Sequence, residues 1–220
     1  MWKGLVHKEL RELAPIAAIA LLACFSIVGR SIGYRVPFFD AGSQGAAFVL
    51  DEFVPCLGFV AVPLAIALGL RQTVAESLTG TWVWLLHRPL PRTKLFAVKL
   101  IVGGGIYALC TALPIVWYAC WAGTPGKRAA PFYWWMTGEA WLVWLTVAAL
   151  YPASFLCGVW PGRWLGARIF ALVGAGAILF LFALGFHQSS WWPLGWIIPP
   201  VLAVGLVSSI LFIARSRDFS

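Results

Sequence analysis

Residues 169–214 read IFALVGAGAILFLFALGFHQSSWWPLGWIIPPVLAVGLVSSILFIA and contain no Asp, Glu, Lys or Arg. A helix needs about 20 apolar residues to cross a hydrocarbon core of roughly 30 Å, so this run is long enough for two crossings. The polar stretch at 187–190, followed by Trp191-Trp192-Pro193, divides it into predicted spans near 169–186 and 195–214. Continuous apolar runs favour helices, because the strands of a membrane barrel alternate in polarity.

The whole chain has the composition of a membrane protein, with 61% hydrophobic residues, 11% charged residues and a mean hydropathy of +0.87. A charge at mid-bilayer costs roughly 3 kcal/mol, so charged residues are expected to mark the ends of the remaining spans. Four more apolar intervals predict spans near 13–29, near 46–70, between Lys99 and Lys127, and between Glu139 and Arg163. The expected fold is an all-α membrane protein with six transmembrane helices in one domain, residues 1–220.

Six spans place both termini on one side of the membrane, and the distribution of basic residues chooses the side. With cytoplasmic termini, 12 of the 16 basic residues face the cytoplasm, and the four outside are Arg30, Arg35, Lys127 and Arg128. The formal net charge of +8 is therefore explained by topology. Binding to nucleic acid is a poor alternative, because the basic residues are dispersed among hydrophobic spans.

The first residues, 1–13, predict an amphipathic helix that lies along the cytoplasmic interface before the chain enters the membrane. Its apolar residues recur at helical spacing, opposite a polar face: Trp2, Leu5, Val6, Leu10 and Leu13 against Lys3, Lys8, Arg11 and Glu12. The alternative is a basic anchor that only fixes topology. The segment can be an interfacial helix and a topology anchor at the same time. The candidate residues of this interfacial helix are Trp2, Lys8, Glu9 and Arg11.

Three acidic residues fall near the predicted outer face, where Asp51 and Glu52 enter the second span and Glu139 opens the fourth. An acid inside a bilayer is a candidate for a transport pathway, whereas one within a turn of the interface can simply be solvated. Solvation is the favoured interpretation, and the pathway role stays open.

The sequence offers little enzyme chemistry of its own. It contains no G-x-x-x-x-G-K-[ST] phosphate loop, since the nearest approach, residues 123–127, is too short. Its three histidines lie in separate segments without a second ligand at metal spacing. We therefore expect neither a metal nor a cofactor in this chain, and no ATP hydrolysis by it alone.

Residues 76–94 read ESLTGTWVWLLHRPLPRTK and form a polar, basic island in the longest predicted cytoplasmic loop, residues 71–94. Val74, Leu78 and Trp82 recur at i, i+4 and i+8, which predicts a short amphipathic helix at the start of the loop. Pro89 and Pro91 then favour an extended turn before the third span. A simple connector needs no such half-apolar helix, so the loop is interpreted as a docking surface for a partner.

The pattern E-x-x-x-G-T, then L-L-x-x-P-L-x-R and a later K, resembles the loop between helices two and three of type-2 ABC transporter permeases. It is carried by Glu76, Gly80, Thr81, Leu85, Leu86, Pro89, Leu90, Arg92 and Lys99. The opening W-K-x-L-x-x-K-E-L-R-E-L, from Trp2 to Leu13, is similar to the interfacial helix of that family.

The resemblance implies the multi-pass membrane subunit of an exporter in the inner (plasma) membrane, working with a second permease subunit that is identical or different. ATP and magnesium would bind to a separate ABC ATPase, on which the loop would dock as a coupling helix. The residues to which the resemblance assigns this coupling role are Glu76, Leu78, Gly80, Thr81, Leu85, Leu86, Arg88, Pro89 and Arg92.

Two alternatives remain at this stage. The membrane subunit of the haem exporter in cytochrome c maturation has a similar length and a comparable loop. From another class, the chain would be a membrane anchor or assembly protein with no transport path.

Overall fold

The computed structural model describes residues 2–34, 46–49, 51–78, 91–126, 131–160, 165–185 and 192–216. Within these ranges all regular structure is helical, which confirms the predicted all-α class there. The elements are α1 Trp2–Ile32, α2 Phe53–Leu78, α4 Arg92–Ala122, the 3-10 helix η1 Trp134–Thr137, α5 Gly138–Ala148, α6 Leu150–Val159, α7 Leu165–Gly185 and α8 Trp192–Ser216.

Five segments of the described chain are long and apolar enough to cross a membrane, namely Lys3–Ile32, Phe53–Glu76, Arg92–Ala122, Trp134–Val159 and Leu194–Arg215. In α7, the apolar segment Ile169–Ile178 is shorter. By length and composition the chain is therefore a helical, multi-pass membrane protein, and the sixth span stays a prediction.

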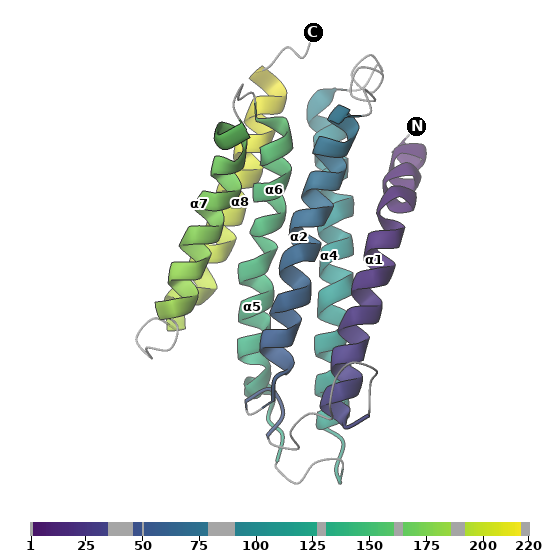
Figure 1. The fold of residues 1–220 in the computed structure, drawn as a ribbon, viewed down its shortest axis with the longest axis vertical. Coiled ribbons are helices and arrows are strands. Elements are labelled where there is room, and N and C mark those ends of the chain that lie inside the picture. The colour runs from purple at the N-terminus through teal and green to yellow at the C-terminus, as the bar shows by residue number, and fades with distance from the viewer. Residues whose placement is uncertain are drawn as a thin grey trace.

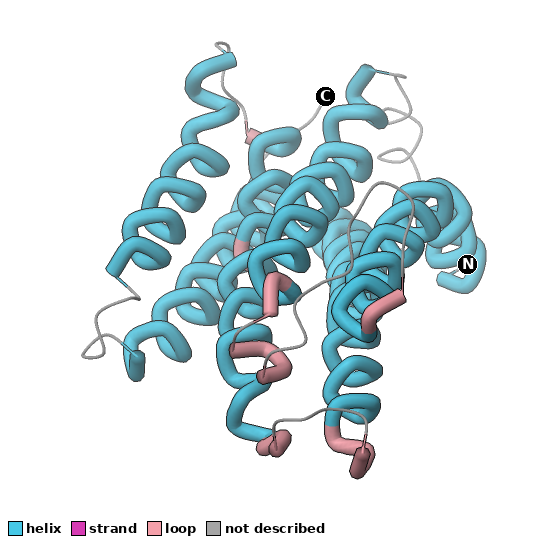
Figure 2. Tube along the Cα trace, turned by 60° about the horizontal axis from the view of Figure 1, so that its bottom comes forward, coloured by secondary structure: helices cyan, strands magenta, loops and turns pink. Residues whose placement is uncertain are grey.

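The long helices lie side by side, and the chain reverses direction from one to the next (Figures 1 and 2). The N-terminal end of α1 and the C-terminal end of α8 lie at the same end of the bundle, at the top of Figure 1. We call this the termini end. The last turn of α2 and the first turn of α4 also lie there, so the predicted loop begins and ends at the termini end (Figure 1).

Glycines allow α2 and α6 to pack with their backbones in close approach. A Cβ atom at Gly69 would overlap the hydroxyl of Ser154 and lie only 2.7 Å from the amide nitrogen of Phe155. A Cβ atom at Gly158 of α6 would likewise overlap the side chain of Thr73. Small residues at such contacts are how helices associate where no hydrophobic effect drives them together. Helix α2 is thereby held at the centre of the bundle, against α1, α4, α5 and α6.

Helix α1 differs from its prediction, because one continuous helix replaces an interfacial helix followed by a span. It passes through Pro15 without a break. Its 31 residues span about 46 Å, more than a hydrocarbon core, so its first turns extend beyond the membrane-spanning part. Leu5 and Leu13 are buried as expected of the apolar face, but Leu10 is exposed and Glu9 is buried. That the first turns lie along the interface stays a prediction.

The boundaries of the predicted loop 71–94 are also corrected. Helix α2 continues through 71–78, and α4 already begins at Arg92. The predicted short helix around Val74 is thus the end of α2, and Lys99 lies inside α4 rather than before it. Residues 79–90 lie outside the described residues.

The second and fourth spans also depart from their predicted form, the second at its start and the fourth near its middle. Helix α2 begins at Phe53 rather than near Ala46, and residues 46–49 form a turn in which Phe48 has a φ of 65°. The predicted fourth span is one apolar segment, but it is divided at Ala149 into α5 and α6. Pro152 explains the division, because it has no N–H to donate to the carbonyl four residues earlier.

Candidate functional site

A buried ion-pair network joins α1, α2 and α4 near the termini end. The ammonium group of Lys99 lies 2.7 Å from the carboxylate of Glu9 and 2.8 Å from that of Glu76. The side chains of Lys99, Glu9 and Glu76 are 0%, 1% and 4% exposed. One lysine of α4 is therefore shared between carboxylates from two other helices.

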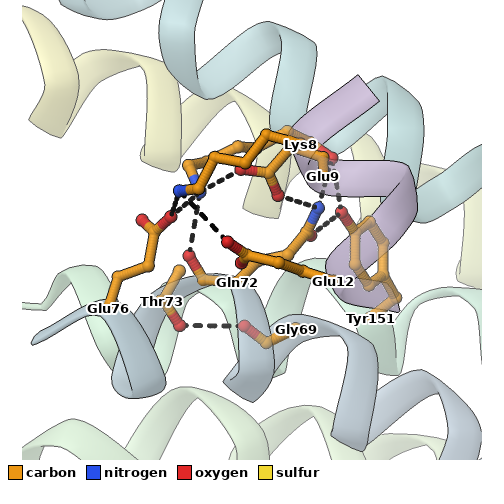
Figure 3. Close-up of polar contacts among 9 residues, drawn as sticks. Lys8, Glu9, Glu12, Gly69, Gln72, Thr73, Glu76 and Tyr151 are labelled. Atoms are coloured by element: carbon orange, nitrogen blue, oxygen red, sulfur yellow. Dashed lines mark hydrogen bonds and ion pairs between the residues drawn. The ribbon is translucent and has the colours of Figure 1, made fainter. Parts of the chain in front are cut away.

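The network continues outward through Lys8 on α1. Its ammonium group lies 2.7 Å from Glu76 and 3.6 Å from Glu12, one helical turn further along α1 (Figure 3). Lys8 and Glu12 are about one-third exposed, with side-chain values of 35% and 33%. The charges alternate along a chain from the open edge to the interior: Glu12, Lys8, Glu76, Lys99 and Glu9.

Two uncharged side chains complete the network and extend it to α6. The amide of Gln72 donates to Glu9 over 3.3 Å and to the carbonyl oxygen of Lys99 over 2.9 Å. The hydroxyl of Tyr151, from α6, donates to the amide oxygen of Gln72 over 2.7 Å and lies 3.1 Å from the Lys99 carbonyl oxygen (Figure 3). Four helices thus share one set of buried polar contacts.

Gly103 is the residue that lets Tyr151 reach the backbone of α4. A Cβ atom at position 103 would overlap the Tyr151 hydroxyl and lie 2.6 Å from the amide oxygen of Gln72. At the next glycine, Gly104, a Cβ atom would make only an ordinary van der Waals contact, and Gly105 faces open space. Of this glycine run, only the first position is required by the network.

The alternation of charge makes this network tolerable in an apolar bundle. An isolated buried ion loses several kcal/mol of hydration, and breaking a buried pair leaves an uncompensated charge behind. Here each buried ion has an opposite charge within 2.8 Å. Buried ion pairs add little net stability compared with apolar residues, so their presence among membrane helices favours a functional role. The arrangement suits mechanical coupling, since it fixes the ends of four helices against one another.

A second polar cluster lies at the opposite end of the bundle. Asp51 is buried there and accepts hydrogen bonds from the hydroxyl of Tyr118 and, over 3.4 Å, from that of Ser31. The ring of Phe48 packs on Tyr118 with centroids 4.7 Å apart. The favoured expectation that Asp51 is solvated is therefore wrong.

The other two pathway candidates are exposed, and their solvation stays a prediction. Glu52 is exposed and pairs with Arg30 over 2.6 Å, and Glu139 is exposed in the first turn of α5. A buried Asp51 and two exposed glutamates do not share one environment, and their pathway role stays a prediction.

The predicted coupling residues are only partly within the described ranges. Glu76 lies inside α2, two residues before its end, and belongs to the buried network. This corrects the expectation that the coupling residues all lie outside the spans. Leu78 is the last residue of α2, and Arg92 is the half-buried first residue of α4. The remaining ones lie outside the described residues: Gly80, Thr81, Leu85, Leu86, Arg88 and Pro89.

The predicted interfacial residues divide between the network and the surface. Lys8 and Glu9 belong to the network, Arg11 is exposed, and Trp2 begins α1. Sequence reasoning did not predict Gln72 or Tyr151, and it placed Lys99 at the end of a span. A usable signal was the spacing Leu5, Glu9, Leu13, which puts a charge in the middle of an apolar helix face.

The described residues contain no group of three or more His, Cys, Asp or Glu side chains that could hold a metal ion. The fold and the site thus define a helical, multi-pass membrane protein with a charged junction at its termini end. Comparisons with protein-family models, characterised proteins and solved structures give no match for this chain. The likeness to type-2 ABC permeases therefore rests on the sequence motifs quoted above.

Proposed function

We propose that the chain is the membrane-spanning permease subunit of an ATP-driven exporter of the type-2 ABC class. In this account the chain forms the transport path with a second permease subunit, and a separate ABC ATPase hydrolyses ATP. The observation that carries the proposal concerns Glu76, the first residue of the quoted motif. It lies at the base of the connection 79–90 and is ion-paired to both Lys8 of α1 and Lys99 of α4.

A coupling segment needs a stiff base, because a push from a partner is lost if the flanking helix ends yield separately. Here the helix before the connection and the helix after it are tied to each other through Glu76 and Lys99. The same pair of residues is tied to α1 through Lys8 and Glu9. Movement of residues 79–90 would then be passed to α1, α2 and α4 through these ion pairs, as transport by moving helices requires.

The proposed topology has six spans across the inner (plasma) membrane, with both termini in the cytoplasm. It is supported by the common end of α1 and α8 in Figure 1 and by the basic residues near that end. Among the described residues these are Lys3, Lys8, Arg11, Arg71, Arg92, Lys94, Lys99 and Arg215. The ends of α2 and α4 lie at the same end, so in this topology the connection begins and ends on the side of a cytoplasmic ATPase.

The test is affinity purification of the tagged full chain from its native membrane. We expect a soluble ATPase of domain size to co-purify, and we expect ATP hydrolysis by that complex. The chain purified away from the ATPase should hydrolyse no ATP above background, because its sequence has no phosphate-binding loop. Robust hydrolysis by the isolated chain, or a native complex without an ATPase, would reject the proposal.

A further inference from the structure

Lys8 occupies a special position in the network, because it lies between two carboxylates that belong to different helices. Glu76 is on α2, 2.7 Å away, whereas Glu12 is on the same helix as Lys8, 3.6 Å away. The pair with Glu76 holds α1 to α2. The pair with Glu12 holds nothing together, since both residues move with α1.

The inner and outer parts of the network differ in how easily their partners can change. Lys99 and Glu9 are completely enclosed, so separating them would leave two buried, uncompensated charges. Lys8 and Glu12 are each about one-third exposed at the open edge of the network. Charges at such an edge can change partners at little cost, because the surroundings solvate them during the exchange.

We propose that Lys8 is the moving part of an ion-pair latch between α1 and α2. In the conformation described here the latch is closed, with Lys8 on Glu76. When the end of α2 moves away from α1, Lys8 passes to Glu12 and Glu76 keeps Lys99. Every charge retains at least one partner in both states, so a force on the end of α2 can select either state without leaving a charge unpaired.

The role given to the latch rests on the proposed function, whereas the experiment that tests the latch does not. Glu76 lies two residues from the end of α2, where the connection 79–90 begins. A push on that connection would open the latch and release the end of α2 from α1, while Lys99 still holds Glu9. The latch would thereby let the end of α2 move with respect to α1, while α4 stays joined to both helices through Lys99.

The test measures the separation of α1 and α2 in the full chain, reconstituted alone in lipid nanodiscs. Spin labels are placed at Lys3→Cys and Arg71→Cys, both exposed positions, with the five native cysteines replaced by alanine. Pulsed electron resonance then gives the populations of short and long distances. Glu76→Gln should raise the long-distance population, because it removes the closed pair. Glu12→Gln should lower that population by roughly twofold, as loss of an i,i+4 pair implies.

The opposite signs of these two effects separate a latch from a merely structural network, in which both changes would loosen the helices. The effect of Glu12→Gln must also disappear in a Lys8→Gln background, because Glu12 acts only through Lys8. Arg11→Gln, on an exposed residue of the same helix, is the matched control and should change nothing. Changes of the same sign, no change, or persistence of the Glu12 effect without Lys8 would overturn the latch.

These measurements need no ATPase, so their outcome is independent of the co-purification experiment. A latch in a chain that purifies without an ATPase would reject the permease proposal and leave the inference standing. A chain that co-purifies with an ATPase, but in which Lys8 does not change partners, would support the permease proposal and overturn the latch.

Discussion

The ammonium group of Lys99 lies 2.7 Å from the carboxylate of Glu9, although the two residues are 90 positions apart in the sequence. Neither side chain is more than 1% exposed. Either charge alone would be unfavourable in an apolar helix, and the ion pair between them offsets part of that cost. The pair fixes α1 against α4 at the base of the connection 79–90.

Replacing Lys99 by Met should strongly destabilise the fold, because it leaves the buried carboxylates of Glu9 and Glu76 without their shared cation. Breaking a buried pair in this way costs about 3–5 kcal/mol. The measurement is the midpoint of thermal unfolding of the full chain in detergent.

The triple variant Glu9→Gln, Glu76→Gln and Lys99→Met is the matched control for that experiment. It removes all three buried charges together and keeps the side chains similar in size, so most of the lost stability should return. A triple variant as unstable as Lys99→Met would show that charge compensation is not what the network provides.

Gly69→Ala should destabilise the contact between α2 and α6, since the added carbon meets backbone atoms of Phe155 and Tyr151 within 2.8 Å. Overpacking of this kind costs about 1–3 kcal/mol. Gly105→Ala, where the added carbon meets nothing within 4 Å, should leave the unfolding midpoint unchanged or slightly raised. Equal effects at the two glycines would refute the close approach of α2 and α6.

Asp51→Ala should weaken the end of the bundle opposite the termini, because it removes the acceptor for the buried hydroxyls of Tyr118 and Ser31. Leaving such groups unsatisfied costs about 1–3 kcal/mol. The neighbouring change Glu52→Ala removes only an exposed pair with Arg30, worth about 0–1 kcal/mol. Thermal unfolding of the two variants should therefore differ, and a larger loss at Glu52 would contradict the burial of Asp51.

The six-span topology predicts which positions an impermeant thiol reagent can reach from outside the cell. Single cysteines at Ser43, Gly126 and Ser190 in a cysteine-free background should be labelled, because the topology puts them on the outer side. Cysteines at Ser77 and Ser216 should react only after the membrane is permeabilised. Labelling of either in intact cells would exclude six spans with cytoplasmic termini.

The helical class and most span positions follow from the sequence, because apolar length is a property of the local chain. Helix α4 covers most of the interval predicted for the third span, and the predicted fourth span overlaps one apolar segment despite its division at Ala149. The predicted start of α2 is too early, since residues 46–49 are apolar and yet form a turn. Hydropathy measures composition, and it does not distinguish a packed aromatic turn from the first turn of a helix.

The buried ion-pair network could not be predicted from the sequence, for a different physical reason. The rule that charged residues end spans puts Glu76 in the loop 71–94 and Lys99 at the start of the third span. The rule fails where charges from different helices neutralise one another, and that depends on contacts such as Glu9 to Lys99, which one sequence does not reveal. Tyr151 is equally hidden, because its role depends on the space that Gly103 leaves on another helix. Only the position of Glu9 on an apolar face gives a local signal.

The coupling role of residues 79–90 is the central claim, and it is tested most directly by ATP hydrolysis in the reconstituted complex with the co-purified ATPase. The variants are Gly80→Val and Arg92→Glu, with Arg11→Gln as an exposed control distant in sequence from the connection. We expect both variants to insert and assemble like the wild type. We also expect the permease-dependent part of the hydrolysis rate to fall, because a β-branched residue resists positive φ and the charge reversal disturbs the start of α4. Wild-type hydrolysis and wild-type binding of the ATPase by both variants would contradict the account and favour a membrane anchor without coupling.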